Sequence, residues 1–188
     1  MRKFLVLLCL LVSVKVFAVD PLQFQMVIPC DSMNAAQLYD VVNKWFAESY
    51  NNSQKVVQLR DESNKFITGK ASLPIVVNSL QWSCLSGTID YNIRVECRDK
   101  RIRVTMDMIS QQCRPGCDPT WSMGTLYNVD INNMDDFYKQ FNIKGLYKAK
   151  YKPFYKHALP LVKHEFASIC ESLVNYIAKK ELKVEDNW

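Results

Sequence analysis

The chain has only two histidines among its 188 residues, and this scarcity limits the metal and acid–base chemistry that it can support. His157 and His164 straddle Pro160, and even a continuous helix would hold them about two turns apart, too far to share one ion. No HExxH pattern occurs. The carboxylate pairs Asp61-Glu62 and Asp135-Asp136 fall in predicted turns or caps, where such side chains serve local hydrogen bonding. The sequence therefore predicts no catalytic residue, no metal site and no cofactor.

The chain also lacks an apolar run long enough to cross a membrane. Residues 4–14 are mostly apolar, but a spanning helix needs roughly 20 such residues, and Lys15 closes the run. Arg2 and Lys3 precede this run and Ala18 follows it, which is the pattern of a secretory signal peptide over residues 1–18. A retained anchor is the alternative. We expect cleavage after Ala18, export to the periplasm or the extracellular space, and no membrane span in the mature protein.

The chain also carries no large excess of positive or negative charge. The formal net charge falls from +5 to +2 once Arg2, Lys3 and Lys15 leave with the signal peptide, which is too little to attract nucleic acid or anionic lipid to the whole molecule. The remaining residues 19–188 have the length of one domain with a sizeable core. We therefore expect a single domain and no nucleic-acid partner.

Cysteine is present in an even number after export. Cys9 belongs to the signal peptide, and six cysteines remain, which an oxidising compartment can pair: Cys30, Cys84, Cys97, Cys113, Cys117 and Cys170. Arg-Pro-Gly separates Cys113 and Cys117, and its Pro-Gly turn could bring the two sulfur atoms together. A disulfide between them is our prediction, with free thiols or half of a zinc site as the alternatives. Cys97 and Cys170 lie on apolar stripes and are predicted to be buried.

The clearest secondary-structure pattern lies between Gly87 and Met108. Apolar residues alternate with polar ones on either side of a turn at 98–100, which is typical of an antiparallel hairpin with one apolar and one polar face. The predicted apolar face contains Ile89, Tyr91, Ile93, Val95, Cys97, Ile102, Val104, Met106 and Met108. The predicted polar face is our candidate binding face and contains Asp90, Asn92, Arg94, Arg103, Thr105 and Asp107.

Other segments supply the remaining elements. Strands are predicted at 22–28, 55–60 and 65–73, the segment 74–86 is ambiguous, and helices are predicted at 34–50, capped by Asp31 or Ser32, and at 161–182. The first helix carries an apolar stripe of Ala35, Leu38, Tyr39, Val42, Trp45, Phe46 and Ser49; the second carries Val162, Phe166, Ile169, Cys170, Leu173, Val174 and Ile177. These elements make an α+β fold, in which an antiparallel sheet of about five strands has two main helices on one face.

Several segments, in their order and spacing, resemble a known family. They are Leu38-Tyr39, 44–50 (KWFAESY), Val56-Val57, Asp61, 67–70 (ITGK), 87–91 (GTIDY) and 98–104 (RDKRIRV). From Phe24 to Met108 the chain resembles the secreted bacterial domain of unknown function DUF4468, which has a TATA-binding-protein-like (TBP-like) fold. It departs from that family in having Asp99-Lys100 where a glycine is expected, and in a long segment from Gln111 to Lys156.

The resemblance implies a fold and an export route, and it implies no catalytic residues. It divides the mature chain into a TBP-like core at 22–110, an inserted segment at 111–156 and a closing helix at 161–182. Within the insert, lysines alternate with aromatic residues over 144–156, and this stretch is either a site for an anionic partner or a connection lying on the core.

Taken together, the sequence favours a non-catalytic binding module of the bacterial cell envelope. An envelope protein, a glycan or a lipid could be its ligand, and the binding surface would be the polar sheet face or the loops at its rim. The alternative is an envelope hydrolase or another enzyme without a recognisable motif.

Overall fold

The computed structural model describes residues 19–50, 56–78 and 81–185, so the predicted signal peptide lies outside the described residues. The strands are β1 (Phe24–Pro29), β2 (Val57–Asp61), β3 (Phe66–Ile75), β4 (Gly87–Arg98), β5 (Arg101–Cys113) and β6 (Gly124–Thr125). The α-helices are α1 (Ala35–Ser49), α3 (Asp135–Gln140) and α4 (Lys148–Glu185), and single 3₁₀ turns form η1 (Ser83–Leu85), η2 (Pro119–Trp121) and η3 (Gly145–Tyr147).

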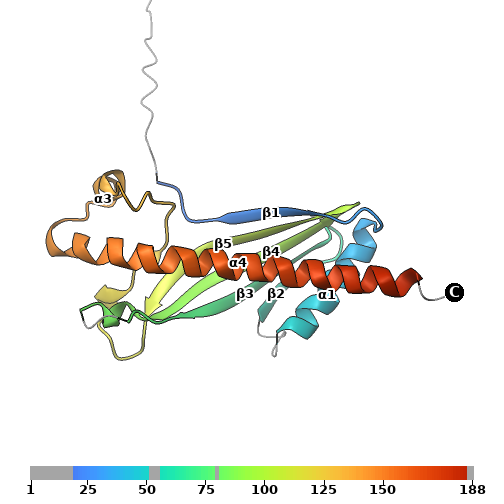
Figure 1. Cartoon of the computed structure of the whole chain (residues 1–188), viewed down its shortest axis with the longest axis horizontal. Coiled ribbons are helices and arrows are strands. Elements are labelled where there is room, and N and C mark those ends of the chain that lie inside the picture. Colours follow the sequence, from blue (N-terminus) through green and yellow to red (C-terminus); the bar gives the residue numbers. More distant parts are fainter. Residues whose placement is uncertain (1–18, 51–55, 79–80, 186–188) are drawn as a thin grey trace, which may run out of the picture.

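The strands form one antiparallel sheet in the order β1-β5-β4-β3-β2, and the short β6 pairs with the far end of β5. The two longest strands, β4 and β5, are the predicted hairpin and occupy the middle of the sheet (Figure 1). The α+β class and the antiparallel sheet predicted from the sequence are therefore confirmed. β3 runs two residues further than predicted, through the ambiguous Pro74 to the buried Ile75.

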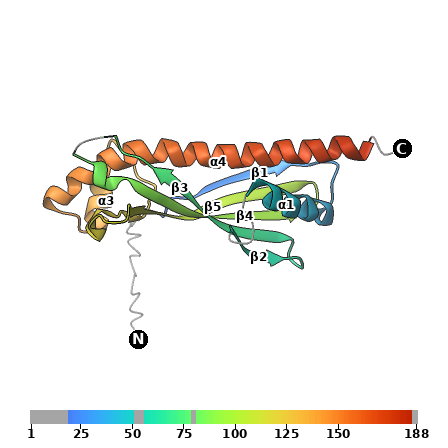
Figure 2. The same ribbon diagram turned by 90° about the horizontal axis from the view of Figure 1, so that it is seen from below.

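Helices α1 and α4 cover the same face of the sheet, with α4 running along its whole length (Figures 1 and 2). Tyr91 of β4 donates a hydrogen bond to Glu165 of α4, while Phe46 of α1 packs beside Ile93 of β4 around Gly69. Tyr91 and Ile93 alternate on one side of the strand, so both helices lie on that side. The core between the layers is apolar, and it includes every predicted inward residue of the hairpin except Met108.

Helix α1 follows its predicted stripe closely. Leu38, Tyr39, Val42, Trp45 and Phe46 are buried, whereas Ala35 is only half-buried and Ser49 is exposed. The helix begins after Asn34, not at the predicted caps, and the Asn34 and Gln37 side chains bond each other's backbone N–H groups in a capping box.

The prediction that Met108 faces the core was wrong. Two residues of β5, Met108 and Ile109, stand opposite the single residue Tyr91 of β4, which makes a β-bulge. Met108 adopts a positive φ of 51° and is 70% exposed, whereas Ile109 takes over the buried position. Strict alternation fails here because one extra residue shifts the phase of the strand.

The predicted start of the last helix was also wrong. Helix α4 begins at Lys148 and not at residue 161, and it contains both Pro153 and Pro160. The Lys/Tyr stretch of the insert thus forms its first turns, with Phe154 and Tyr155 buried on the core. Further along, the predicted stripe is buried except for Val174.

The residues between β5 and α4 pack at the end of the sheet far from the β4–β5 turn. Leu126 donates its backbone N–H to Ile109 and accepts one from Leu22, and Met134 and Phe137 are buried. Leu22 lies outside β1 but is buried, whereas Met26 within β1 is exposed. The insert is therefore part of the single core and closes one end of the sheet.

Candidate binding face

The six residues of the candidate binding face lie on one side of the sheet, opposite the helices. In the register of β4 and β5, Arg94 pairs with Thr105 and Asn92 pairs with Asp107, while Asp90 and Arg103 follow by alternation. Five of the six side chains are half-buried and Thr105 is buried. The structure thus brings the predicted residues together, and their role in binding stays a prediction.

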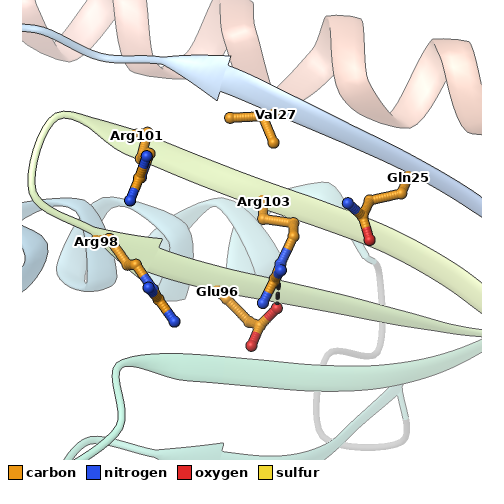
Figure 3. A pocket seen from close by; sticks show the side chains of 6 residues that line it. All are labelled: Gln25, Val27, Glu96, Arg98, Arg101 and Arg103. Carbon is orange, nitrogen blue, oxygen red and sulfur yellow. Dashed lines mark hydrogen bonds and ion pairs between the residues drawn. The ribbon is translucent and has the colours of Figure 1, made fainter.

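Charge is unevenly distributed along this face. Near the β4–β5 turn, a shallow pocket of about 220 Å³ is lined by Gln25, Val27, Glu96, Arg98, Arg101 and Arg103 (Figure 3). We call this the arginine pocket. Asp90 and Asp107 lie on the same face further from the turn, where Ser72 donates a hydrogen bond to Asp90. The face is therefore basic near the turn, whereas further along it carries these two acids together with Lys70, which pairs with Asn92.

Glu96 is held by two arginines of the face. Arg103 Nε lies 2.6 Å from Glu96 Oε2, and Arg94 Nη2 lies 3.4 Å from Glu96 Oε1. The hydrogen bond from Arg103 is the main reason why the pKa of Glu96 is lowered. Arg94 also stacks its guanidinium 3.9 Å from the centre of the Phe66 ring. Both arginines are thus engaged within the protein.

Arg98 and Arg101 are different. They pair directly across the β4–β5 turn, and neither makes an ion pair within the described part of the chain. Like charges directly opposite each other in a sheet are destabilising. Figure 3 shows both projecting from the strands on the side of Glu96 and Arg103. The sequence pattern predicts only a turn in this segment, although the two arginines that flank it are a signal from which the pocket could have been suspected.

The thiols lie in two groups. Cys97 and Cys170 are buried as predicted, and burial raises the pKa of Cys97 to about 12. Cys113 Sγ lies 3.6 Å from the carbonyl oxygen of Asp118, and the described cysteines all carry thiols. Cys117 Sγ instead accepts a hydrogen bond from Arg114 Nε at 3.3 Å, and its thiol is close enough to Cys84 to help raise the pKa of the Cys84 thiol, which burial raises most. The Cys113–Cys117 disulfide stays a prediction, with Cys84 as a competing partner that sequence spacing does not reveal.

The remaining candidates have local roles. Asp61 accepts hydrogen bonds from the backbone and side chain of Asn64 in the β2–β3 turn, and these bonds lower the pKa of Asp61. Asp135 and Asp136 occupy the first turn of α3. Both histidines are exposed on α4, and His157 Nε2 lies 2.9 Å from the carbonyl oxygen of Val76. Among residues 19–50, 56–78 and 81–185, no three potential ligands gather as a metal site would require.

The alternating Lys/Tyr stretch divides between core and surface. Four lysines of the stretch are exposed: Lys144, Lys148, Lys152 and Lys156. Lys150, Phe154 and Tyr155 are buried. No helix in the described part of the chain combines the length and the apolar character that a membrane crossing requires.

Comparison with known proteins agrees with this architecture. Residues 24–112 match the family model described as a domain of unknown function (DUF4468) with a TBP-like fold. A TBP-like protein from Parabacteroides distasonis ATCC 8503 is 18% identical, with a TM-score of 0.54 over 82% of this chain and 94% of that chain. A DUF4468 family protein from Bacteroides ovatus ATCC 8483 is also 18% identical, with a TM-score of 0.52 over 81% and 86% of the two chains. No curated protein matches.

These comparisons confirm the resemblance to DUF4468 and the TBP-like fold that the sequence predicts. At such low identity they show the fold alone, and a fold carries no particular activity with it.

Proposed function

We propose that this chain is an exported, non-catalytic module that binds an acidic partner on its polar sheet face. The family that residues 24–112 match has no known function, so the support for this proposal comes from the site. The arginine pocket is the observation that carries the proposal. It combines an unneutralised pair, Arg98 and Arg101, with a surface that α1 and α4 leave uncovered (Figure 2).

The unpaired arginines favour a carboxylate-bearing partner. Two like charges held directly opposite each other destabilise the pairing of the strands, and an anion between them would offset that repulsion. A guanidinium also presents parallel N–H groups that match the two oxygen atoms of a carboxylate. Gln25 and Val27 at the side of the pocket add one polar and one apolar contact.

The chemistry of the pocket supports binding over hydrolysis. Guanidinium groups stay protonated in proteins, so Arg98, Arg101 and Arg103 cannot exchange protons as a general acid or base would. The carboxylate of Glu96 is engaged by Arg94 and Arg103, and its lowered pKa makes it a weaker base. These properties favour the binding module over the alternative of an envelope hydrolase.

A short acidic segment of an envelope protein is the partner that fits this face best. Asp90 and Asp107 follow the arginine pocket along the same strands, and they would repel a long, uniformly charged polyanion such as nucleic acid. An acidic segment of a few residues can occupy the basic end without reaching them. Export would also remove the protein from most nucleic acid.

We expect the double variant Arg98→Ser/Arg101→Ser of the 19–188 domain to lose a partner that the unaltered domain captures from envelope extract. The physical reason is the loss of both unpaired guanidiniums from the pocket. Lys163→Ser/Lys179→Ser is the matched control, because it removes the same charge from exposed positions on α4. Capture of the same proteins by all three baits would contradict the proposal, and exclusive capture of glycan or lipid would replace the acidic segment as the partner.

Export is tested separately by intact-mass measurement of the protein recovered from the producing cells. We expect a mature protein that begins at or near Val19, because Ala18 closes the short apolar region with Val16 two residues before it. A mass that includes residues 1–18 would overturn the export part of the proposal and leave the arginine pocket untouched.

A further inference from the structure

A second pocket lies at the opposite end of β4 from the arginine pocket. It is lined by Trp82, Thr120, Trp121, Tyr147 and Lys150 and encloses about 320 Å³. We call it the tryptophan pocket. One wall is the loop before η1, between β3 and β4, and the others are η2, η3 and the first turn of α4, which the insert brings to this end of the sheet. A volume near 300 Å³ is at the lower end for small-molecule sites, so it fits one ring and not a polymer.

Lys150 brings a buried positive charge to this pocket. The residue is 6% exposed, and its Nζ donates to the carbonyl oxygen of Thr120. The same Nζ lies 5.9 Å from the centre of the Trp121 ring and 5.7 Å from that of Tyr147, which places the ammonium at the pocket wall. An ammonium has three N–H donors, and Thr120 accepts one of them. Lys150 makes no ion pair with the described carboxylates.

The surroundings of this ammonium raise the positive potential further. Lys150 lies in the first turn of α4, where the helix dipole is positive and where no acidic residue is present. Asp118, the neighbouring carboxylate, caps the start of η2; its side chain is exposed and accepts the backbone N–H of Thr120 at 2.9 Å. Burial lowers the pKa of Lys150, since a charge removed from water without a counter-ion is disfavoured. A buried charge without its partner is costly, and a bound anion would supply that partner.

We propose that the tryptophan pocket binds a small molecule that carries a carboxylate on a six-membered ring. The carboxylate lies at Lys150 Nζ and takes up its remaining N–H donors. The ring lies against the indole faces of Trp82 and Trp121, which offer flat apolar surface next to the charge. This site is separate from the arginine pocket and does not depend on the proposed acidic partner.

The experiment titrates the 19–188 domain with two carboxylates, glucuronate and benzoate, while the indole N–H resonances are followed by NMR. Glucose and benzamide are the neutral analogues. Trp45 is an internal reference, because its ring is buried and its indole N–H donates to Ser172 of α4, which does not line the tryptophan pocket. We expect the Trp82 and Trp121 resonances to shift with at least one carboxylate and not with its neutral analogue. A response to glucuronate alone identifies a sugar acid, and a response to benzoate alone identifies an aromatic acid.

Lys150→Met is the decisive variant and should raise the dissociation constant by about tenfold or more, as expected when a charge-assisted contact is lost. It should remain folded, because an apolar side chain of similar length in place of a buried charge is often neutral for stability. Lys152→Met, an exposed lysine two residues along α4, is the matched control and should bind normally. Trp121→Ala, at a half-buried position, should also weaken binding in a folded protein.

Three outcomes would overturn the proposal. The first is the absence of any shift with either carboxylate at concentrations of about 10 mM, which is weak even for a single-ring ligand. The second is equal binding of a carboxylate and its neutral analogue. The third is unchanged affinity in Lys150→Met.

Discussion

Ile93→Asp is expected to unfold the domain, or nearly so. Ile93 lies in the middle of β4 with 0% exposure, and its side chain packs with Phe46 of α1 around Gly69. An aspartate here removes about 2 to 5 kcal/mol of packing and adds the cost of an unpaired buried charge. The total stability of a domain is typically about 5 to 15 kcal/mol, so little would remain. Urea unfolding followed by far-UV circular dichroism would measure the loss.

Arg94→Ala is the control for this prediction, one residue away and on the opposite face of the strand. Arg94 has a half-exposed side chain, a 3.4 Å contact with Glu96 and a stacking contact with Phe66. Losing these contacts should cost about 0.5 to 1.5 kcal/mol. If Arg94→Ala instead unfolds the protein, Arg94 is buried in the protein as it exists in solution. The polar face is then covered, and the arginine pocket is not open to a partner.

Trp45→Ala should destabilise the domain by about 3 to 5 kcal/mol. Trp45 is 1% exposed, and its ring meets that of Phe46 edge-on at 4.9 Å. Its indole Nε1 donates to Ser172 Oγ of α4 at 3.1 Å, so a single side chain joins the two helices that cover the sheet. The alanine variant leaves a cavity that the rigid sheet beneath cannot fill. Thermal unfolding should show the effect as a markedly lower melting temperature.

Ser172→Ala separates packing from hydrogen bonding at this position. It keeps the Trp45 ring and removes its acceptor at a part-buried position, and the cost should be about 0.5 to 1.5 kcal/mol, less than that of Trp45→Ala. An unchanged melting temperature in Trp45→Ala, together with the loss of a captured partner, would mean that Trp45 belongs to a binding site and not to the core.

The parts of the fold that the sequence predicts are those in which one periodic pattern persists. β4 alternates without interruption from Ile89 to Cys97, and α1 keeps one apolar stripe from Leu38 to Phe46. Both patterns arise because one side of each element faces the same core. The candidate binding face follows from the same alternation, which is why its six residues do lie together.

The missed features depend on tertiary contacts that a local pattern does not encode. Met108 fits the alternation of β5, yet an extra residue opposite Tyr91 turns it outward. The start of α4 was missed because Pro153 and Pro160 each remove a backbone donor and normally argue against a helix interior. Packing of Phe154 and Tyr155 against the core stabilises the helix in spite of them.

Neither pocket could be predicted from the sequence, for a related reason. The arginine pocket needs the pairing of Arg98 with Arg101 and the neighbouring strand β1, whereas the tryptophan pocket joins residues 82, 120–121 and 150 from distant parts of the chain. The sequence shows that lysines and aromatic residues alternate over 144–156, but it does not show that Lys150 alone turns inward.

The order of the strands also has a consequence for aggregation. The two longest strands, β4 and β5, are flanked by other strands, and the sheet ends in β1, of six residues, and β2, of five. β1 finishes in Pro29, which lacks a backbone donor, and the pairing of β2 is irregular between Val57 and Leu59. Short, interrupted edges are poor templates for a strand from another molecule. With a net charge as small as that expected for the mature chain, the colloidal stability of the protein depends on these edges more than on electrostatic repulsion.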